Sequence, residues 1–400
     1  MNKKKEIVPK LRFPEFVNED KWKNKRIEQL LTIGNGCDYK HLSKGDIPVY
    51  GSGGYMCSVD DFLYDGDSVC IGRKGTIDKP IFLRGKFWTV DTLFYTHSYK
   101  NCIPKFIYNI FQRINWLKYN EAGGVPSLSK TTINKINIYI PKIPEQQKIA
   151  DCLSSIDELI DAESRKLKAL EKYKKGLLQK LFPAEGKNIP EWRFPEFQGC
   201  GEWKLQKLKL ICDFQEGYAF SSSDFVANDT DSNYIQVVRI TDINNKNSNT
   251  DKVFVNMDLI KRNDLYKYLI SKNDLILSLT GAAGFNFFIW NTNIAVLNQR
   301  TLKLIPKDEN NHAIKFLIEP LIHKEINMHG TGQNNNLSKE VLKNVEIVLP
   351  TSFKEQQKIS DCLSEIDKII TEQSNKVEQL KAHKKGLMQG LFPSLEEADV

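Results

Sequence analysis

The chain of 400 residues contains a long segment that occurs twice, and this repetition constrains the fold more than any other feature. The segment EQQKIADCLSSIDELIDAESRKLKALEKYKKGLLQKLFP at residues 145–183 returns as EQQKISDCLSEIDKIITEQSNKVEQLKAHKKGLMQGLFP at 355–393. The offset is 210 residues throughout, the alignment has no gap, and 23 of 39 positions are identical. Because a repeat of this kind dictates architecture, the chain is expected to consist of two related halves.

A shorter tag, RFPEF, precedes each copy of the long segment. It stands at residues 12–16 and 193–197, and each copy is followed closely by a tryptophan, Trp22 and Trp203. The step from the end of the tag to the start of the long segment is 129 residues in the first half, Phe16 to Glu145, and 158 in the second, Phe197 to Glu355. Length variation is therefore confined to the two intervening regions, called here the variable domains. We interpret the repeated segments as a frame and the variable domains as the functional parts.

Apolar residues in the repeated segment recur at alternating steps of four and three, which is the heptad pattern of a helix with one apolar seam. Glu163 and Lys174 interrupt the first seam, and Gln373 and Lys384 interrupt the second at the same places. The pattern predicts two helices of about 37 residues, each roughly 55 Å long. The predicted seam consists of Ile149, Leu153, Ile156, Ile160, Leu167, Leu170, Leu177 and Leu181 in the first copy and Ile359, Leu363, Ile366, Ile370, Val377, Leu380, Leu387 and Leu391 in the second.

The ends of both predicted helices carry recognisable signals. Pro144 suits the first turn of the first helix, Ser352 and Glu355 are spaced as a capping box for the second, and Phe-Pro ends both. A lone helix of this length would expose its seam, so pairing of the two copies is favoured over packing of each helix on its own domain. Two tag–domain–helix units close under a two-fold axis if the helices are antiparallel. The second helix would then end near the first tag, with the variable domains at opposite ends.

These features predict an α+β fold with two mixed α/β domains, two long antiparallel helices forming an intramolecular coiled coil, and a pseudo-two-fold circular organisation. The predicted division along the chain follows from the repeat. It places the first variable domain with its tag at 1–142, the first helix at 143–185, the second variable domain with its tag at 186–350, the second helix at 351–393 and an acidic tail at 394–400.

Composition narrows the class of protein only modestly. A formal charge of +7 and a pI near 8.7 permit a polyanionic partner without proving one. No apolar stretch approaches the roughly 18 residues of a membrane helix, so a soluble, cytoplasmic protein without membrane contact is expected. Eight cysteines are scattered without a C-x-x-C pair. We interpret them as reduced thiols rather than as zinc ligands or disulfides.

The duplicated order, with helices that open EQQKIA or EQQKIS and end KKGLLQKLF or KKGLMQGLF, resembles the specificity (S) subunit of type I restriction-modification systems. The resemblance covers essentially the whole chain. It implies that each variable domain is a target recognition domain that reads one half of a bipartite, asymmetric sequence in double-stranded DNA. The helices would set the non-specific spacer between the halves and dock the methyltransferase subunits.

The resemblance also implies the partners and cofactors. The family's subunit binds two modification (methyltransferase) subunits, and restriction subunits with motor and nuclease activity join that core. No cofactor is expected in this chain, because S-adenosylmethionine, ATP and Mg²⁺ belong to the partner subunits. The alternative is a non-catalytic scaffold or adaptor whose coiled coil tethers other proteins without reading DNA.

In the first variable domain, IPVYGSGGY (47–55) and CIGRKGTID (70–78) are strand-like runs that open into glycine-rich turns. Glycines let a backbone approach a phosphate closely, and the polar side chains beside them supply donors. A third loop, GGVPSLS (123–129), resembles the family's loop between domain and helix. Ordinary hairpin turns with solvated side chains remain the alternative. The predicted DNA-binding residues here are Tyr50, Ser52, Gly53, Tyr55, Arg73, Lys74, Thr76 and Ser127.

The second variable domain offers YIQVVRITDI (234–243), LSLTGAAGFN (277–286), VLNQRTLKL (296–304) and GTGQNNNLS (330–338). Arginine with glutamine or asparagine beside glycine turns suits major-groove readout. Solvated loop amides are the alternative for the last segment. The predicted DNA-binding residues here are Gln236, Arg239, Asp242, Thr280, Asn298, Gln299, Arg300, Gln333, Asn335 and Asn336, with Asn334 beside them.

Motifs for catalysis are missing from the sequence. A methyltransferase needs a glycine-rich cofactor loop and a motif of the N-P-P-F or D-P-P-Y type, and neither occurs. No Walker A motif or nuclease P-D-x-n-E-x-K arrangement occurs either, and the six histidines show no metal-ligand spacing. We therefore expect a chain that is not an enzyme and holds no metal.

Overall fold

The computed structural model describes residues 8–227, 233–244, 252–279, 287–290, 293–308, 317, 318, 320–322 and 339–393. The chain divides into two compact units, which are Met1–Lys166 with Gln373–Val400 (unit 1) and Leu167–Glu372 (unit 2). Each unit contains one variable domain and parts of both long helices. The predicted division cuts the chain into five consecutive segments, whereas unit 1 combines two separate stretches of the chain. The predicted boundaries stay a prediction.

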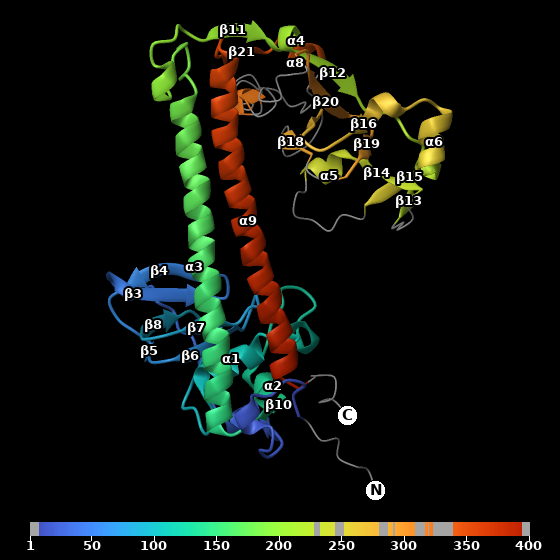
Figure 1. The fold of residues 1–400 in the computed structure, drawn as a ribbon. Coiled ribbons are helices and arrows are strands. Elements are labelled where there is room, and N and C mark those ends of the chain that lie inside the picture. The colour runs from blue at the N-terminus through green and yellow to red at the C-terminus, as the bar shows by residue number, and fades with distance from the viewer. Residues whose placement is uncertain are drawn as a thin grey trace. The chain divides into compact units, whose positions relative to one another are not determined.

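The two repeated segments form long helices, shown in green and red in Figure 1. They are α3 (Ile143–Leu181) and α9 (Phe353–Leu391), with 39 residues each, so the prediction of 37 was slightly short. All sixteen predicted seam residues are buried or half-buried. These residues therefore lie on the less exposed side of each helix.

Polar contacts show that the helices pair in opposite directions within each unit. In unit 1, Lys384 of α9 contacts Asp157 of α3 at 2.6 Å, and further along Gln373 donates to the Glu163 carboxylate at 2.6 Å. In unit 2, Lys174 contacts Asp367 at 2.5 Å, and Leu181 further along α3 packs in one core with Ile359 and Leu363 nearer the start of α9. Rising numbers in one helix meet falling numbers in the other, so the antiparallel pairing is confirmed.

The residues that interrupt the apolar seam are the ones that form these contacts. The repeat offset of 210 residues makes Lys174 with Asp367 the counterpart of Lys384 with Asp157. Hydrogen bonds from Lys376 and then Gln373 lower the pKa of Glu163 below its ordinary value. The interruptions thus supply polar pairs that fix which residues of the two helices face each other.

The variable domain of unit 1 is built on short strands in separate sheets. Strands β1 and β10 pair antiparallel, and two four-stranded sheets have the orders β2-β9-β6-β7 and β4-β3-β8-β5, with β3 and β8 parallel. The strands are β1 (Lys23–Arg26), β2 (Thr32–Asn35), β3 (Lys44–Gly51), β4 (Gly54–Val59), β5 (Tyr64–Asp65), β6 (Ser68–Gly72), β7 (Ile81–Leu83), β8 (Lys86–Thr89), β9 (Leu93–His97) and β10 (Asn137–Ile140), and the short helices are α1 (Pro104–Phe111) and α2 (Lys130–Lys135).

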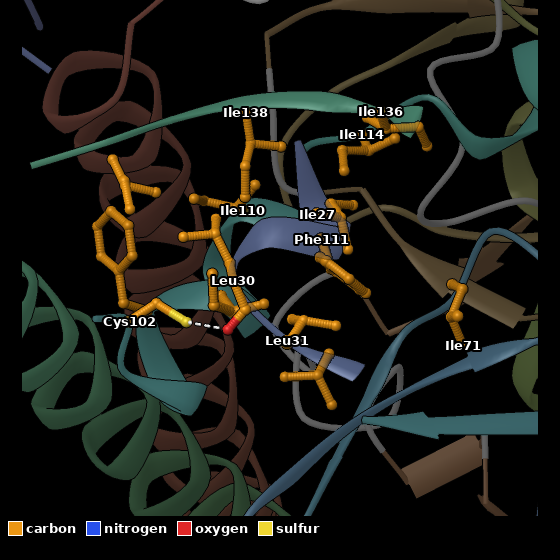
Figure 2. Packing of buried hydrophobic residues seen from close by; sticks show 14 of the residues in the cluster. Ile27, Leu30, Leu31, Ile71, Cys102, Ile110, Phe111, Ile114, Ile136 and Ile138 are labelled. Carbon is orange, nitrogen blue, oxygen red and sulfur yellow. Dashed lines mark hydrogen bonds between the residues drawn. The ribbon is translucent and has the colours of Figure 1, made fainter. Parts of the chain in front are cut away.

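The main core of unit 1 joins this domain to both long helices. Figure 2 shows part of it, with Phe111 and Ile110 from α1 beside Ile27 and Leu30. Ile149 and Leu153 of α3 and Leu391 and Phe392 at the end of α9 belong to the same cluster. Burying each such side chain contributes about 1.5–3 kcal/mol, so the helix ends are held firmly to the domain.

The variable domain of unit 2 repeats this plan with different lengths. Strands β11 and β21 pair antiparallel, and the larger sheets have the orders β12-β20-β17-β18 and β13-β15-β14-β19-β16, with β14 and β19 parallel. The strands are β11 (Lys204–Lys207), β12 (Cys212–Glu216), β13 (Val226–Ala227), β14 (Tyr234–Val238), β15 (Val253–Asn256), β16 (Leu269–Ile270), β17 (Leu275–Ser278), β18 (Phe287–Ile289), β19 (Ala295–Leu297), β20 (Thr301–Pro306) and β21 (Glu346–Leu349), and the short helices are α4 (Leu208–Ile211), α5 (Ile240–Asn244), α6 (Met257–Arg262) and α8 (Lys339–Asn344).

The two units share one frame despite their different sequences. In each, an antiparallel strand pair leads into a long helix, and one parallel strand contact lies inside a larger sheet. The α+β class is therefore confirmed. Within the part of the chain that the structure describes, no helix is both long enough and apolar enough to cross a membrane.

The eight cysteines are free thiols that differ in exposure. Burial raises the pKa of Cys70 to about 12 and that of Cys102 to about 11, whereas Cys37 and Cys200 are exposed. Because the thiolate is the nucleophile, we expect iodoacetamide to label Cys37 and Cys200 in the native protein and Cys70 and Cys102 only after unfolding. Mass spectrometry of a labelling time course measures this, and equal rates at all four thiols would contradict the structure.

Candidate nucleic-acid interface

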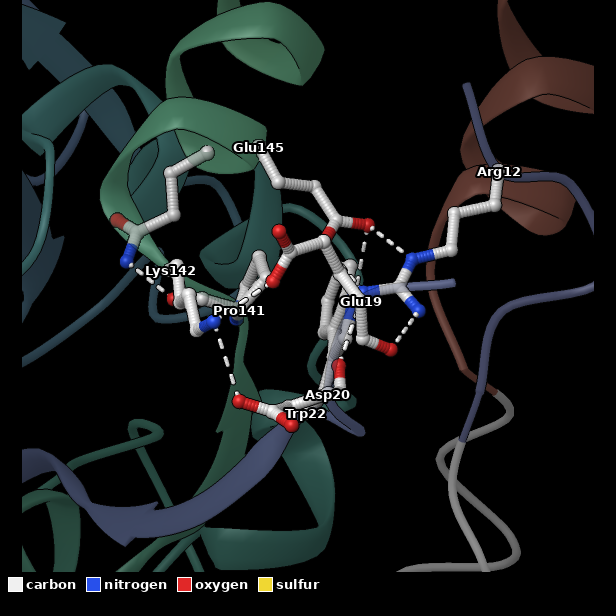
Figure 3. Close-up of polar contacts among 8 residues, drawn as sticks. Arg12, Glu19, Asp20, Trp22, Pro141, Lys142 and Glu145 are labelled. Carbon is white, nitrogen blue, oxygen red and sulfur yellow. Dashed lines mark hydrogen bonds and ion pairs between the residues drawn. The ribbon is translucent and has the colours of Figure 1, made fainter. Parts of the chain in front are cut away.

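A buried arginine–glutamate pair attaches the variable domain of unit 1 to the start of α3. Arg12 donates from Nε and Nη2 to the two carboxylate oxygens of Glu145 at 2.8 and 2.7 Å, and Trp22 Nε1 donates to Glu145 at 3.3 Å (Figure 3). The guanidinium also donates to the carbonyls of Glu19 and Asp20 at 2.9 Å each. The hydrogen bond with Glu145 raises the pKa of Arg12.

Unit 2 contains the same arrangement at the start of α9. Arg193 donates to both carboxylate oxygens of Glu355 at 2.6 Å, and Trp203 Nε1 donates to Glu355 at 3.2 Å. The side chains of Arg193 and Glu355 are only 8% and 0% exposed. We call each set of arginine, tryptophan and glutamate a junction clamp. The sequence pattern predicted a capping box between Ser352 and Glu355. The Glu355 carboxylate is instead bound in the clamp. The N–H of Glu355 donates to the backbone carbonyl of Ser352 at 3.1 Å.

Each clamp lies where the end of the other helix returns. In unit 1, Leu11 beside the first tag donates its N–H to the carbonyl of Gly390 at 2.8 Å, close to the end of α9. In unit 2, the N–H of Trp192 donates to the carbonyl of Lys180 at 3.0 Å, close to the end of α3. The expected return of the second helix to the first tag is therefore found. The RFPEF repeat signalled these junctions in the sequence, but its contacts could not be assigned there.

In unit 1 the hairpin between β3 and β4 carries four of the predicted residues. Ser52 and Gly53 form its tip, and the rings of Tyr50 and Tyr55 approach to 6.1 Å between centroids. Tyr55 is 62% exposed, and its hydroxyl lies 3.1 Å from Ser58 Oγ. The hairpin therefore presents a polar tip with an exposed aromatic ring beside it.

The loop after β6 is held against two other segments of unit 1. The N–H of Arg73 donates to the carbonyl of Thr92 at 2.8 Å, and the N–H of Gly75 donates to that of Pro126 at 2.9 Å. Lys74 forms an isolated β-bridge with Ser127. Gly75 has a φ of +90°, and a Cβ there would lie 3.1 Å from Ser52 Oγ. The structure thus brings together the predicted residues of all three loops.

A surface hollow in unit 1 extends this cluster. It is lined by the hairpin tip, by Asp38, Tyr39 and Lys40, and by Asp91 and Thr92 in the turn after β8. These five residues were not predicted, because no sequence motif marks them. Arg73 and Lys74 are exposed, as phosphate-binding cations must be, and Thr76 is half-buried beside them.

In unit 2 the predicted residues gather where the parallel strands β14 and β19 end. The N–H of Asn298 donates to the carbonyl of Val238 at 3.0 Å, which places the Asn298 turn beside Arg239. Arg239 and Asp242 form an ion pair at 3.2 Å, so part of their hydrogen-bonding capacity is satisfied within the domain. Gln299 and Arg300 are exposed in the turn.

The remaining predicted residues of unit 2 are either half-buried in a strand or outside the described residues. Gln236 is half-buried within β14, two residues before the strand ends. The others lie outside the described residues, and these are Thr280, Gln333, Asn334, Asn335 and Asn336. Among the described residues, no group of histidine, cysteine and acidic side chains could hold a metal ion.

Each unit thus offers exposed donors on turns that a rigid sheet holds in place. Cations and backbone N–H groups can bind phosphates, while amide, guanidinium and carboxylate groups can read base edges. The two clusters contain different side chains on the same frame.

Comparison with known proteins identifies the family of the chain. Residues 19–172 and 201–381 match the family described as the type I restriction modification DNA specificity domain. The type I restriction enzyme MjaVIII specificity subunit of Methanocaldococcus jannaschii is 27% identical over 349 residues, which are 82% of this chain and 76% of that protein.

Solved structures show the same fold. The S subunit of a type I restriction-modification system from M. genitalium has a TM-score of 0.69 at 15% identity, over 97% of this chain and 100% of its own. A chain from a study of complex assembly and conformational transition of the type I R-M system has a TM-score of 0.50 at 14% identity, over 93% of this chain and 98% of its own.

The chain therefore belongs to the family of type I restriction-modification DNA specificity subunits. Supplying DNA sequence specificity to such a system is the function of this family and of this chain. Specificity subunits are not themselves catalytic, and they work within a larger complex that binds DNA.

Proposed function

We propose that the variable domain of each unit reads one half of a bipartite, asymmetric target in double-stranded DNA. The observation that carries this proposal is the pair of polar clusters that stand on one shared frame but differ in side chains, with Ser52, Arg73 and Lys74 in unit 1 and Asn298, Gln299 and Arg300 in unit 2. Identical readers would recognise a symmetric site. Different readers require two unlike half-sites.

The long helices suit a role as the spacer between the half-sites. A helix of 39 residues is roughly 58 Å long, which equals about 17 base pairs of B-DNA at 3.4 Å per pair. This length is an upper bound for the non-specific spacer. The polar pairs between α3 and α9 keep the helices from sliding, which a fixed spacer needs.

The partners are proposed to be two methyltransferase subunits docked along the helices, with restriction subunits joining the full complex in the cytoplasm. S-adenosylmethionine, ATP and Mg²⁺ would be bound by those partners and not by this chain. Exposed Arg73 and Lys74 support binding to phosphates, so affinity for DNA should fall steeply with salt concentration.

Exchanging one variable domain tests the proposal. Residues 21–141 are replaced by the corresponding region of another family member, and the chain is expressed with its methyltransferase partner. The first half-site should change completely while the second half-site and the spacer length stay the same, because only one reader has been replaced. Sequencing of methylated bases in the cells measures all three properties.

The reciprocal exchange of residues 202–350 is the matched control and should change only the second half-site. A single continuous target, or an unchanged target after either exchange, would contradict the proposal. An unchanged target would instead favour the scaffold alternative, in which the coiled coil tethers proteins without reading DNA.

A further inference from the structure

One short turn occurs at the same place in both variable domains. In unit 1 it runs from Val90 to Leu93, and the N–H of Leu93 donates to the Val90 carbonyl at 2.9 Å. In unit 2 it runs from Asn298 to Thr301, where the corresponding hydrogen bond is 3.3 Å long. Each turn directly follows the second strand of the parallel pair, β8 or β19. We call these the reading turns.

The parallel strands fix the first residue of each reading turn. Val90 donates its N–H to the Tyr50 carbonyl at 2.9 Å, at the end of β3. Asn298 donates its N–H to the Val238 carbonyl at 3.0 Å, at the end of β14. The two turns therefore leave the sheet from equivalent positions.

A glycine closes the second side of each turn. A Cβ at Gly36 would lie 1.9 Å from the Val90 carbonyl oxygen, and one at Gly217 would lie 2.0 Å from that of Asn298. The residues after these glycines bind the strand itself, since Cys37 and Tyr218 donate N–H groups to the last residues of β8 and β19 at 2.8 and 2.9 Å. The glycines are 181 residues apart, which is also the offset between the two RFPEF tags.

The loop after the neighbouring strand closes the third side. Arg73, after β6, donates its N–H to the Thr92 carbonyl at 2.8 Å. Leu279, after β17, donates its N–H to the Arg300 carbonyl at 2.9 Å. The backbone of both turns is thus held on three sides by equivalent hydrogen bonds, although the two sequences, Val-Asp-Thr-Leu and Asn-Gln-Arg-Thr, have little in common.

The two middle side chains are the most exposed ones of each turn. Asp91 is exposed and Thr92 half-buried in unit 1, while Gln299 and Arg300 are both exposed in unit 2. The backbone at the third residue also differs, since Arg300 has a φ of +65°. A rigid backbone with interchangeable side chains is suited to specificity, because it can place different hydrogen-bonding groups at one point.

We propose that Asp91 and Thr92 are specificity-determining residues of the first domain, at the place where Gln299 and Arg300 stand in the second. This inference rests on the proposed reading of DNA by both domains. Gln299 and Arg300 carry donors suited to purine edges in the major groove. Asp91 can only accept. Cytosine and adenine both offer an amino donor in the major groove, but adenine also presents the N7 acceptor, which repels a carboxylate, so we assign Asp91 to cytosine.

The charge of Asp91 supports a discriminating role. A carboxylate is repelled by phosphates and adds nothing to general affinity for DNA, so its value at such a surface lies in rejecting bases without a donor. Arg73 and Lys74 stand next to it in the structure, since both donate backbone N–H groups to the Thr92 carbonyl. Their cations supply the phosphate attraction that the acid lacks.

The test is Asp91→Asn in the complete complex with its methyltransferase partner. Initial methylation rates are measured on duplexes that differ by one base pair at each position of the first half-site. Asparagine keeps the shape but adds a donor that suits adenine. The preference for cytosine over adenine at one position of the first half-site should fall by roughly 5- to 150-fold, which corresponds to the about 1–3 kcal/mol of one bidentate contact.

Two further variants complete the test. Gln299→Glu should change one position of the second half-site and leave the first unchanged. Asp46→Asn is the matched control, because Asp46 is an exposed aspartate near the opposite end of β3, and it should alter neither half-site.

The outcomes separate this inference from the proposed function. If the unchanged chain directs methylation at no bipartite target, the proposed function fails. If it does, but Asp91→Asn leaves the ranking of bases in the first half-site as it was, or slows all duplexes equally, the assignment of the reading turn is overturned. A changed ranking confined to the first half-site supports it.

Discussion

Replacing Arg193 with alanine is expected to lower the free energy of unfolding of unit 2 by about 3–5 kcal/mol, because it leaves the fully buried carboxylate of Glu355 without its cation. The carbonyls of Cys200 and Gly201, which accept from the same guanidinium at 2.7 and 3.1 Å, lose their donor as well. Native-state hydrogen exchange measures this loss locally. Arg12→Ala should have a similar effect on unit 1.

The control for this prediction is Arg84→Ala in unit 1. Arg84 and Asp67 form an ion pair at 2.9 Å, but the arginine side chain is 75% exposed, so the expected loss is below about 1 kcal/mol. Equal losses for the Arg12 and Arg84 variants would show that burial of the clamp is unimportant, contrary to the structure. A larger loss of unfolding free energy in Arg12→Ala than in Arg84→Ala shows that burial determines how much the arginine–carboxylate pair stabilises the unit.

Replacing Gly36 with alanine is expected to reduce both the stability of unit 1 and its reading of the first half-site. The new Cβ would lie 1.9 Å from the Val90 carbonyl oxygen, so β2 or the reading turn must move. Overpacking of this kind costs about 1–3 kcal/mol or more. Hydrogen exchange reports the lost stability, and methylation rates report the displaced turn.

Gly53→Ala is the matched control, since a Cβ at Gly53 would meet nothing within 4 Å. It should leave the stability of unit 1 nearly unchanged. A neutral result for Gly36→Ala would mean that the strand and the turn are not in close contact, and the three-sided support of the reading turn would then be wrong.

The long helices could be predicted from the sequence because their signal is local. Each seam residue predicts the next one three or four positions away, and the second copy confirms the pattern, so even the polar interruptions such as Glu163 and Lys174 were found. The antiparallel direction of the two helices was predicted from the duplication alone, because two equal units close under a two-fold axis. The helix starts were predicted to within two residues, at 143 and 351 against the observed Ile143 and Phe353. The partner of the Glu355 side chain was not predicted, because a capping pattern is local, whereas Glu355 binds Arg193 from 162 residues away.

The interface was only partly predictable for the same reason. Glycine-rich turns marked Ser52, Arg73 and Lys74, and the structure brings them together. Asp91 and Thr92 lie in a turn with no glycine and no motif. Asp91 and Thr92 correspond to Gln299 and Arg300 only through the backbone hydrogen bonds that hold the two turns. These bonds join segments that are far apart in the chain and unlike in sequence, so the correspondence could not be predicted.

The contact between Glu163 and Gln373 has a consequence for how such a chain can arise and assemble. These residues occupy the same position of the repeat, so one position meets its own counterpart. Two identical half-length chains would set glutamate against glutamate or glutamine against glutamine there, and the first pairing brings like charges together. A duplicated gene can place a different residue in each copy. The chain is in effect a covalent heterodimer whose halves have become complementary at this position.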